Sequence, residues 1–269
     1  HPFKNHPFKV IDDESMLRTV ESVAQYGVLA PAIARPREEG GYELISGHRR
    51  HHASELAGRE TMPVIIRNLD DDAATILMVD SNLQRETILP SERAFAYKMK
   101  LEAIKHQGAR SDLTSCQVGT KLRTDEMLAK DSGDSARQVQ RYIRLTELIP
   151  ELLSMVDEKK ISFNPAVELS YLTKEEQQDF LEAMDMEQNT PSLSQAQRLK
   201  KLSQEGNCTL EAMAEIMAEV KKDELDKVTI KNDVLKKYFP KSYTPKQMQD
   251  IIIKLLEGWH KKRTRDMER

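Results

Sequence analysis

Hydrophobic residues first recur at helical spacing near the start of the chain. Leu17, Val20 and Ala24 share one face of the helix that this spacing predicts. Ser15 stands where a capping residue is expected, and Gly27 follows where a left-handed stop is common. We therefore expect a first helix that is capped by Ser15 and ends before Gly27.

Short apolar runs separated by glycines follow this helix and predict strands. The runs 28–34 and 42–45 flank Gly40-Gly41 in a hairpin-like arrangement. Because proline has no backbone N–H, the strand beside Pro31 is expected to be an edge strand or to be interrupted. A helix at 48–57 and a strand at 62–66 complete a small mixed α/β domain.

From Asp70 onward, nearly every periodic segment is helical. Residues 107–123 carry two glycines and little periodicity, so they are expected to form a linker. The predicted helices cover 73–83, 91–106, 124–132, 135–145, 150–156 and 244–262. Capping patterns predict three helix starts, at Asn164-Pro165, at Thr173 with Glu176, and, for the helix 244–262, at Thr244-Pro245 with Gln247.

Composition places limits on the chemistry. Lys and Arg number 41 and Asp and Glu 44, which gives a net charge of −3 and excludes a uniformly basic nucleic-acid coat. The two cysteines, Cys116 and Cys208, have no nearby partner at the spacing of a zinc site or a disulfide framework. No run reaches the roughly 20 apolar residues of a membrane span, so we expect a cytoplasmic protein.

A helix-turn-helix pattern lies at 124–145. The first helix ends at Gly133, and Asp134 or Ser135 can cap the second. Ala136, Val139 and Ile143 share one face of the second helix. Another face carries a stripe of arginines and is flanked by glutamines; the residues expected to contact DNA are Ser135, Arg137, Gln138, Gln140, Arg141 and Arg144.

The arginine stripe has an alternative explanation, because a solvated charged face has the same spacing. Two features favour a helix that reads the major groove. No acidic residue interrupts 135–145, and a predicted helix with a glycine turn precedes it.

A second group of residues is suited to anions. Gly47, His48, Arg49 and Arg50 stand at a strand-to-helix junction, where free backbone amides and guanidinium groups converge. In the run 80–86, Asn82 offers an oxygen to a hard cation and Arg85 offers a second phosphate clamp. Together these residues suggest a nucleoside triphosphate with magnesium, although a surface helix start with solvated arginines gives the same pattern.

Five motifs, in order, resemble the ParB/Noc-like family of chromosome- and plasmid-partition proteins, and most of all the ParB-like proteins of Gram-positive mobile elements. The resemblance covers roughly residues 5 to 205. The motifs are Asn5-His6-Pro7-Phe8-Lys9, Gly27-Val28-Leu29-Ala30-Pro31, Gly47-His48-Arg49-Arg50, Asn82-Leu83-Gln84-Arg85-Glu86, and the helix-turn-helix followed by Arg144-Leu145 and 148–152.

The resemblance implies a homodimer that binds CTP and Mg2+ with its N-terminal domain and a palindromic DNA site with its middle domain. It also implies a clamp that spreads along DNA, association with the nucleoid, and a possible ParA-like ATPase partner. Gly47, His48, Arg49, Arg50, Asn82 and Arg85 would form the nucleotide site, with Asn82 at the metal.

Two positions depart from the family pattern. His48 and Ser81 stand where the family commonly has glutamates, and neither supplies a fixed negative charge at neutral pH. The sequence therefore leaves open whether nucleotide is hydrolysed, and no catalytic residue is predicted. Two other functions compete with the CTP-responsive partition protein: a CTP hydrolase or ParB-like nuclease, and a transcriptional regulator with a vestigial nucleotide pocket.

The sequence thus predicts an α+β, mostly α fold with three parts. Residues 1–88 form the nucleotide-binding domain, 89–205 the helical DNA-binding domain, and 206–269 a divergent helical module. In this last part the family pattern is lost. Its final helix carries one broad apolar face that is expected to be core or a dimer seam, made of Met248, Ile251, Ile252, Leu255, Leu256 and Trp259.

Overall fold

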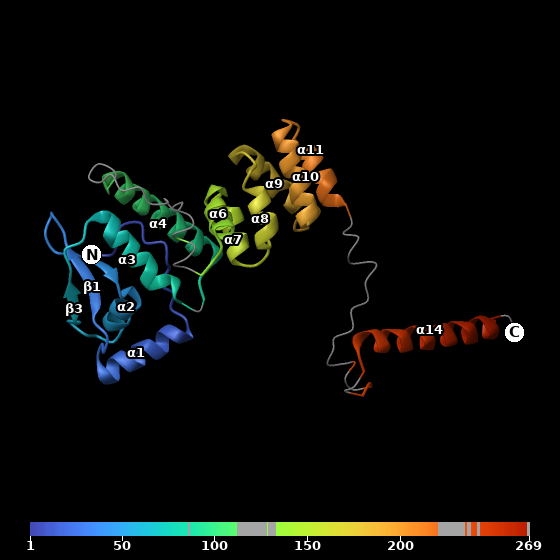
Figure 1. The fold of residues 1–269 in the computed structure, drawn as a ribbon, viewed down its shortest axis with the longest axis horizontal. Helices are drawn as coiled ribbons and strands as arrows, with labels where there is room; N and C mark the ends of the chain where they lie inside the picture. Colours follow the sequence, from blue (N-terminus) through green and yellow to red (C-terminus); the bar gives the residue numbers. More distant parts are fainter. Residues whose placement is uncertain are drawn as a thin grey trace. The chain divides into compact units, whose positions relative to one another are not determined.

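The computed structural model describes residues 1–85, 87–111, 128, 133–219, 235, 238–240 and 243–267 (Figure 1). The chain divides into two compact units, His1–Glu219 and Val220–Arg269. Helices predominate among the described residues and one small sheet is present, so the predicted mostly helical α+β class is confirmed. None of the helices in these ranges is long and apolar enough to cross a membrane.

The sheet has three described strands, with β1 in the centre. They are β1 (Ala32–Pro36), β2 (Tyr42–Ser46) and β3 (Val64–Ile66). β1 pairs antiparallel with β2, which confirms the hairpin, and parallel with β3. Of the two alternatives expected beside Pro31, the edge strand is wrong, because β1 is the central strand of the sheet. Pro31 precedes β1, so its missing N–H lies outside the strand. The β1–β2 register does shift at Ile33.

The first helix, α1 (Glu14–Tyr26), is capped by Asp13 and not by Ser15. The Asp13 carboxylate accepts the N–H of Met16 at 2.7 Å, which satisfies one of the free donors of the first turn. Gly27 follows the helix with φ 72°, as the sequence predicts.

The apolar face of α1 also differs from the predicted one. Met16 and Val23 are buried, whereas Leu17 is 60% exposed. The buried side chains contact Ala53 of α2 (His48–Leu56), which lies against α1. Both helices were predicted, but the packing of α2 on α1 determines which residues of α1 are buried.

Two long helices follow the sheet and lie side by side (Figure 1). α3 (Asp71–Leu83) packs on β2, and α4 (Pro90–Ser111) packs on α3 and on the helices beyond. α4 continues to Ser111, so residues 107–111 are helical and the predicted linker does not begin at 107. Residues 112–123 lie outside the described part of the chain.

The first helix of the predicted helix-turn-helix also falls outside the described residues, except for Leu128. That residue is helical and fully buried, in a cluster with Tyr97 and Val139. The rest of the helical bundle consists of α6 (Ala136–Arg144), a short 3-10 helix (Leu145–Glu147), α7 (Pro150–Asp157), α8 (Phe163–Leu169), α9 (Lys174–Glu187), α10 (Leu193–Gln204) and α11 (Leu210–Ala218).

The predicted helix starts of the bundle fare differently. Thr173 and Glu176 form the expected capping box at the start of α9. The start predicted at Asn164 is wrong, because Ser162 is the N-cap of α8 and Asn164 lies inside the helix. α11 follows the predicted boundary at residue 205 yet packs on α9, and that boundary stays a prediction.

The second unit contains α14 (Pro245–Met267). Thr244 and Gln247 bond each other's backbone N–H groups at 2.9 and 3.4 Å, so the predicted cap is confirmed. On the predicted apolar face, Leu255, Leu256 and Trp259 are exposed. A dimer seam along this helix remains a prediction.

Gly47 offers a test of the junction between β2 and α2. Its φ is 105°, and an added Cβ would stand 2.8 Å from the Cβ of the buried Ala32. We expect Gly47→Ala to lower the free energy of unfolding by about 1 to 2 kcal/mol from the positive φ and by roughly 1 to 3 kcal/mol more from the clash.

Gly58 is a matched control, because its φ is 67° but an added Cβ would meet nothing within 4 Å. In urea unfolding, Gly58→Ala is expected to show the backbone cost alone. Equal losses for the two variants would contradict the close approach of Gly47 to Ala32.

Candidate functional site

α6 presents two faces, as predicted. Ser135 is its N-cap, and the hydroxyl accepts the N–H of Gln138 at 3.2 Å. Val139 is fully buried against Tyr97 and Leu128. The apolar face therefore anchors α6 on α4 and turns the opposite face outward.

The three arginines of the outward face differ in how they are held. Arg137 is exposed, and among the described residues no hydrogen bond or ion pair holds it. Arg141 donates to Asn164, and its guanidinium lies 5.0 Å from the ring centroid of Phe163. Its partners leave Arg141 partly exposed on the same side of the helix.

Arg144 is fixed more firmly than Arg141. Its Nη2 donates to the Ser170 carbonyl at 2.7 Å, and its Nε to the Ser170 hydroxyl at 3.2 Å. The guanidinium also lies 4.2 Å from the ring centroid of Tyr171. Within the described ranges, no carboxylate pairs with any of these arginines. The predicted stripe thus contains an exposed Arg137, an Arg141 bonded to Asn164 at the surface and an Arg144 bonded to Ser170. Their contacts with DNA stay predictions.

α4 fixes the turn that precedes α6. The Tyr97 hydroxyl donates to the Asp134 carboxylate at 2.5 Å, and Arg93 Nη1 lies 3.3 Å from the same oxygen. The guanidinium of Arg93 also lies 5.3 Å from the ring centroid of Tyr142 on α6. One acidic residue before the cap therefore holds the start of α6 on α4.

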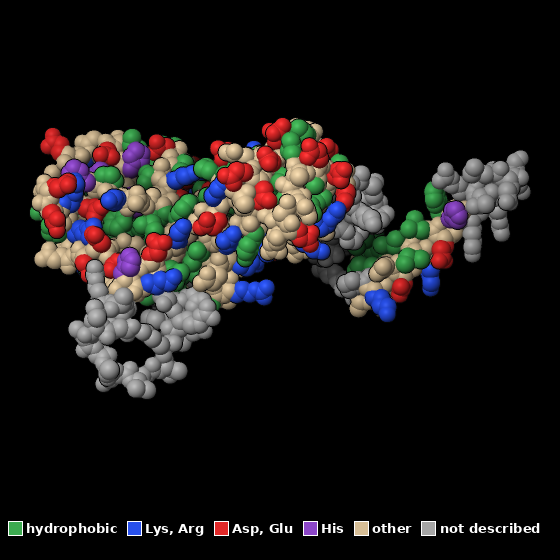
Figure 2. All heavy atoms as spheres, turned by 90° about the horizontal axis from the view of Figure 1, so that it is seen from above, with side chains coloured by type: hydrophobic (Ala, Val, Ile, Leu, Met, Phe, Trp, Pro, Cys, Tyr) green, Lys and Arg blue, Asp and Glu red, His purple; other side chains and the backbone are tan. Residues whose placement is uncertain are grey.

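A pocket of about 740 Å³ opens where α2, the end of α3 and the start of α4 approach the α7–α8 turn. Five basic and three acidic residues line it, so its charge is positive by two. They are Lys9, Arg49, Arg85, Arg93 and Lys159, with Asp13, Glu92 and Asp157. Acidic and basic side chains elsewhere are interspersed over the face seen in Figure 2, and do not form one basic surface.

Two residues of the predicted nucleotide site meet in this pocket. Arg49 lies 3.6 Å from Asp13 and donates to the Ser15 hydroxyl at 3.0 Å. Arg85 lies 5.4 Å from the Phe8 ring centroid. Burial lowers the pKa of Arg85 and the charge of Arg49 lowers it further, while Glu92 opposes the shift. Two guanidinium groups that repel each other are an environment that favours an anion.

Other predicted nucleotide-site residues, Gly47, His48, Arg50 and Asn82, do not line this pocket. Arg50 donates to the carbonyls of Ala30 and Pro31, and so holds the loop ahead of β1. Asn82 is buried, and its amide nitrogen donates to the Met78 carbonyl at 2.8 Å. Their roles toward a nucleotide or a metal stay predictions.

The pocket includes residues that the sequence did not single out as ligands. Lys9 comes from the N-terminal loop, Arg93 from α4 and Lys159 from the turn after α7. Lys9 is the last residue of the motif that begins at Asn5, so the motif could have identified it. Nothing in the local pattern of Arg93 or Lys159 distinguishes them from other surface cations.

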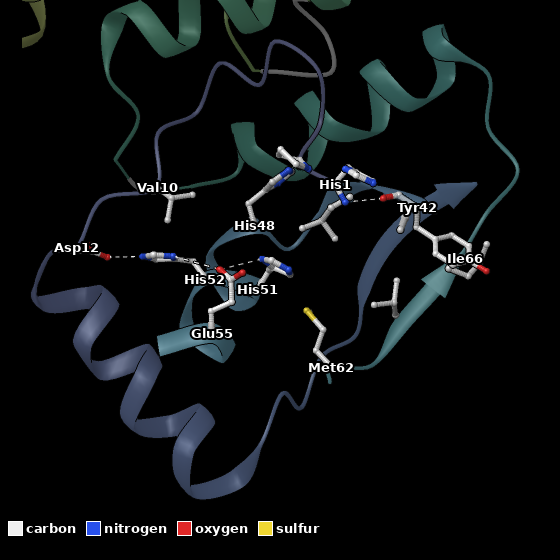
Figure 3. A pocket seen from close by; sticks show the side chains of 14 residues that line it. His1, Val10, Asp12, Tyr42, His48, His51, His52, Glu55, Met62 and Ile66 are labelled. Carbon is white, nitrogen blue, oxygen red and sulfur yellow. Dashed lines mark hydrogen bonds and ion pairs between the residues drawn. The ribbon is translucent and has the colours of Figure 1, made fainter. Parts of the chain in front are cut away.

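His48 faces a different cavity, of about 780 Å³, which is lined mainly by apolar side chains and by other histidines of α2 (Figure 3). Its ring lies 3.9 Å from that of His6, and its Nε2 is buried with no hydrogen-bond partner among the described residues. Burial, followed by the nearby His6 and Arg85, lowers the pKa of His48 to about 3, although a hydrogen bond to the Leu44 backbone opposes the shift. His48 is therefore neutral at physiological pH.

His51 and His52 border the same cavity and contact acidic residues. His52 Nε2 lies 2.8 Å from Asp12, and His51 Nδ1 lies 3.5 Å from Glu55 (Figure 3). Among the described residues, no group of three or more His, Cys, Asp or Glu side chains is placed to hold a metal ion.

Two family models match the chain. The ParB N-terminal domain matches residues 1–83, and the ParB HTH domain matches residues 117–190. The chain belongs to the ParB family. The resemblance seen in the sequence is thereby confirmed, and the anion pocket and α6 fall in or beside the two matched domains.

Relatives of this ParB-family chain include three named bacterial proteins. Stage 0 sporulation protein J of Bacillus subtilis is 34% identical over 60% of this chain and 51% of its own length. The chromosome-partitioning protein Spo0J of Thermus thermophilus is 31% identical over 65% and 58%. The nucleoid occlusion protein of Listeria innocua is 31% identical over 73% and 63%. The chain spans about half the length of the first of these relatives.

Solved structures with a similar fold include truncated ParB of Caulobacter crescentus. Its complex with the centromeric parS site has a TM-score of 0.44 at 21% identity, and covers 82% of this chain and 95% of that one. Its complex with CTP-gamma-S has a TM-score of 0.30 at 26% identity, and covers 63% and 86%. Because both TM-scores are below 0.5, the assignment rests on the family models and the sequence relatives.

The lowered pKa of His48 predicts a pH dependence of stability. Between about pH 3 and the ordinary value of 6.5, the unfolded chain binds a proton at this position that the folded chain does not. Stability is therefore expected to fall as the pH falls through this window. Urea unfolding at about pH 7 and about pH 5 measures the difference.

His48→Phe removes the group that binds the proton in the unfolded chain and keeps an aromatic ring beside His6. We expect the variant to lose less stability than the wild type between the two pH values. An identical loss in both proteins would show that other groups cause the pH dependence.

Proposed function

We propose that this chain is a CTP-responsive, site-specific DNA-binding partition protein of the ParB type. The observation that carries the proposal is the arrangement of α6. Its N-terminal half presents Arg137, which is exposed and has no partner in the described part of the chain. Its apolar face is fixed on α4, whose first turn borders the basic pocket. The family membership and the names of the relatives support the same function.

The proposed DNA contact begins with Arg137. An unpaired guanidinium near the start of a recognition helix can donate two hydrogen bonds to a guanine edge or pair with phosphate. Arg141 can join it by leaving Asn164, because that contact is at the surface. Arg144 contributes by fixing α6 on Ser170, so its role is positioning. A palindromic site read by a homodimer would double each contact.

The proposed nucleotide site is the basic pocket. Its volume suits a nucleotide, and Arg49 and Arg85 suit a phosphate chain. The choice of CTP as the ligand rests on the family resemblance. The pocket residues alone favour a phosphorylated ligand and do not distinguish one base from another.

Magnesium fits the described pocket less well than phosphate does. The Glu92 carboxylate already accepts the N–H groups of Lys9 and Leu89, at 2.8 and 3.1 Å. Asp157 accepts from Ser91, and Asp13 from Met16. Since these carboxylates are engaged, we assign no metal ligand among them and propose nucleotide binding without a hydrolytic step.

The proposal includes three partners beyond the chain itself. A second copy would associate through the apolar face of α14, where Leu255 and Trp259 are exposed. DNA bound by α6 would keep the protein on the nucleoid. A ParA-like ATPase would act on the assembled complex.

The DNA contact is tested with Arg137→Ala. We expect this variant to lose about 1 to 3 kcal/mol of the free energy of specific DNA binding. Arg141→Ala is expected to lose an amount in the same range. Gel-shift titration against DNA recovered with the purified protein measures the loss. Arg18→Ala is the control, because it removes one exposed cation from α1.

Arg144→Ala distinguishes reading from positioning. This variant is expected to lose thermal stability together with DNA affinity, whereas Arg137→Ala loses affinity alone. If Arg137→Ala binds DNA as the wild type does, the proposed contact of α6 with DNA is wrong.

The nucleotide site is tested by calorimetry with CTP, GTP and ATP. CTP is expected to bind, and Arg49→Gln to weaken it about tenfold, because a charge-assisted hydrogen bond to phosphate is lost. Arg37→Gln, outside the pocket, is the control. No heat with any nucleotide would favour a regulator with a vestigial pocket, and phosphate release that DNA changes would favour a hydrolase.

A further inference from the structure

One wall of the basic pocket comes from the helical bundle. The end of α7 and the turn after it bring Asp157 and Lys159 into the lining of the pocket, which also includes Arg49 and Arg85. The pocket is therefore shared between the sheet domain and the bundle that carries α6.

The turn after α7 is held on the start of α4 by one carboxylate. Asp157 accepts the backbone N–H of Ser91 at 3.0 Å and its hydroxyl at 2.5 Å, at the first turn of α4. Asp157 is thus committed to capping α4 and fixes the position of the residues that follow it.

Lys159 differs from its neighbours in two respects. Its φ is 61°, a left-handed conformation that side chains other than glycine adopt at a cost. Within the described residues its ammonium group has no ion pair or hydrogen bond, whereas the adjacent Lys160 pairs with Glu158 at 2.7 Å. A strained backbone therefore carries an uncommitted cation at the edge of a basic pocket.

We infer that Lys159 contacts the phosphate chain of the pocket's ligand, so that the ligand is held by both the sheet domain and the helical bundle. The inference rests on the proposed nucleotide function. It adds a residue from the bundle that the sequence motifs did not include. An anion bound between Arg49, Arg85 and Lys159 would neutralise cations that the fold otherwise holds near one another.

The left-handed backbone at Lys159 allows a variant that removes the cation without an expected loss of stability. Lys159→Gly removes the cation and relieves the left-handed backbone, so the thermal midpoint is expected to stay the same or rise. CTP affinity, measured by calorimetry, is expected to fall about 3- to 10-fold, and its dependence on salt concentration is expected to become weaker.

Two further variants separate a direct contact from a general charge effect. Lys160→Ala removes the same charge from the next residue but leaves the pocket lining intact, so it is expected to bind CTP as the wild type does. Lys159→Arg keeps the cation and is expected to retain most of the affinity.

The outcomes separate this inference from the function on which it rests. If the wild type binds CTP and Lys159→Gly binds it equally well, the inference is wrong and the nucleotide function stands. Equal losses for Lys159→Gly and Lys160→Ala would also overturn it, in favour of a long-range field. If the wild type binds neither CTP nor inorganic triphosphate, both proposals fail.

Discussion

The attachment of Asp134 to α4 is the polar interaction that fixes the start of α6 on the rest of the first unit. The Tyr97 hydroxyl is 2.5 Å from this carboxylate, and Tyr97 is almost fully buried. α4 packs on α3 as well as on α6, so the helix that covers α3 also sets the start of α6. Because Arg93 also reaches Asp134 and borders the basic pocket, the pocket and α6 share one support.

Local signals in the sequence predicted most helices and strands, because caps and hydrophobic spacing act within a few residues. The capping box at Thr173 is such a case. Errors arose where two polar residues lie close together and either can cap, as with Asp13 and Ser15. The choice there depends on which residues are buried, and α2, far along the chain, decides that Met16 is buried.

The candidate sites were predicted in part, for a related reason. Helical spacing placed three arginines on one face of α6, but the groups that hold two of them come from α8 and the residues after it. Periodicity therefore could not separate the exposed Arg137 from Arg144, which Ser170 fixes. In the same way, Arg49 and Arg85 were found through their motifs, whereas Lys159 joins them only through the packing of α7 against α4.

His48 and Arg49 show how one residue change can alter a pocket that it does not line. Adjacent positions on a helix differ by about 100°, so the two side chains serve different cavities. The Arg85 cation disfavours protonation of His48, so the two side chains lie within electrostatic reach of each other. A glutamate at position 48 would place a negative charge within that reach. That charge would attract the Arg85 guanidinium and offset part of its positive field. The histidine therefore leaves Arg85 more available to an anion, while it supplies no carboxylate to hold a metal or activate water.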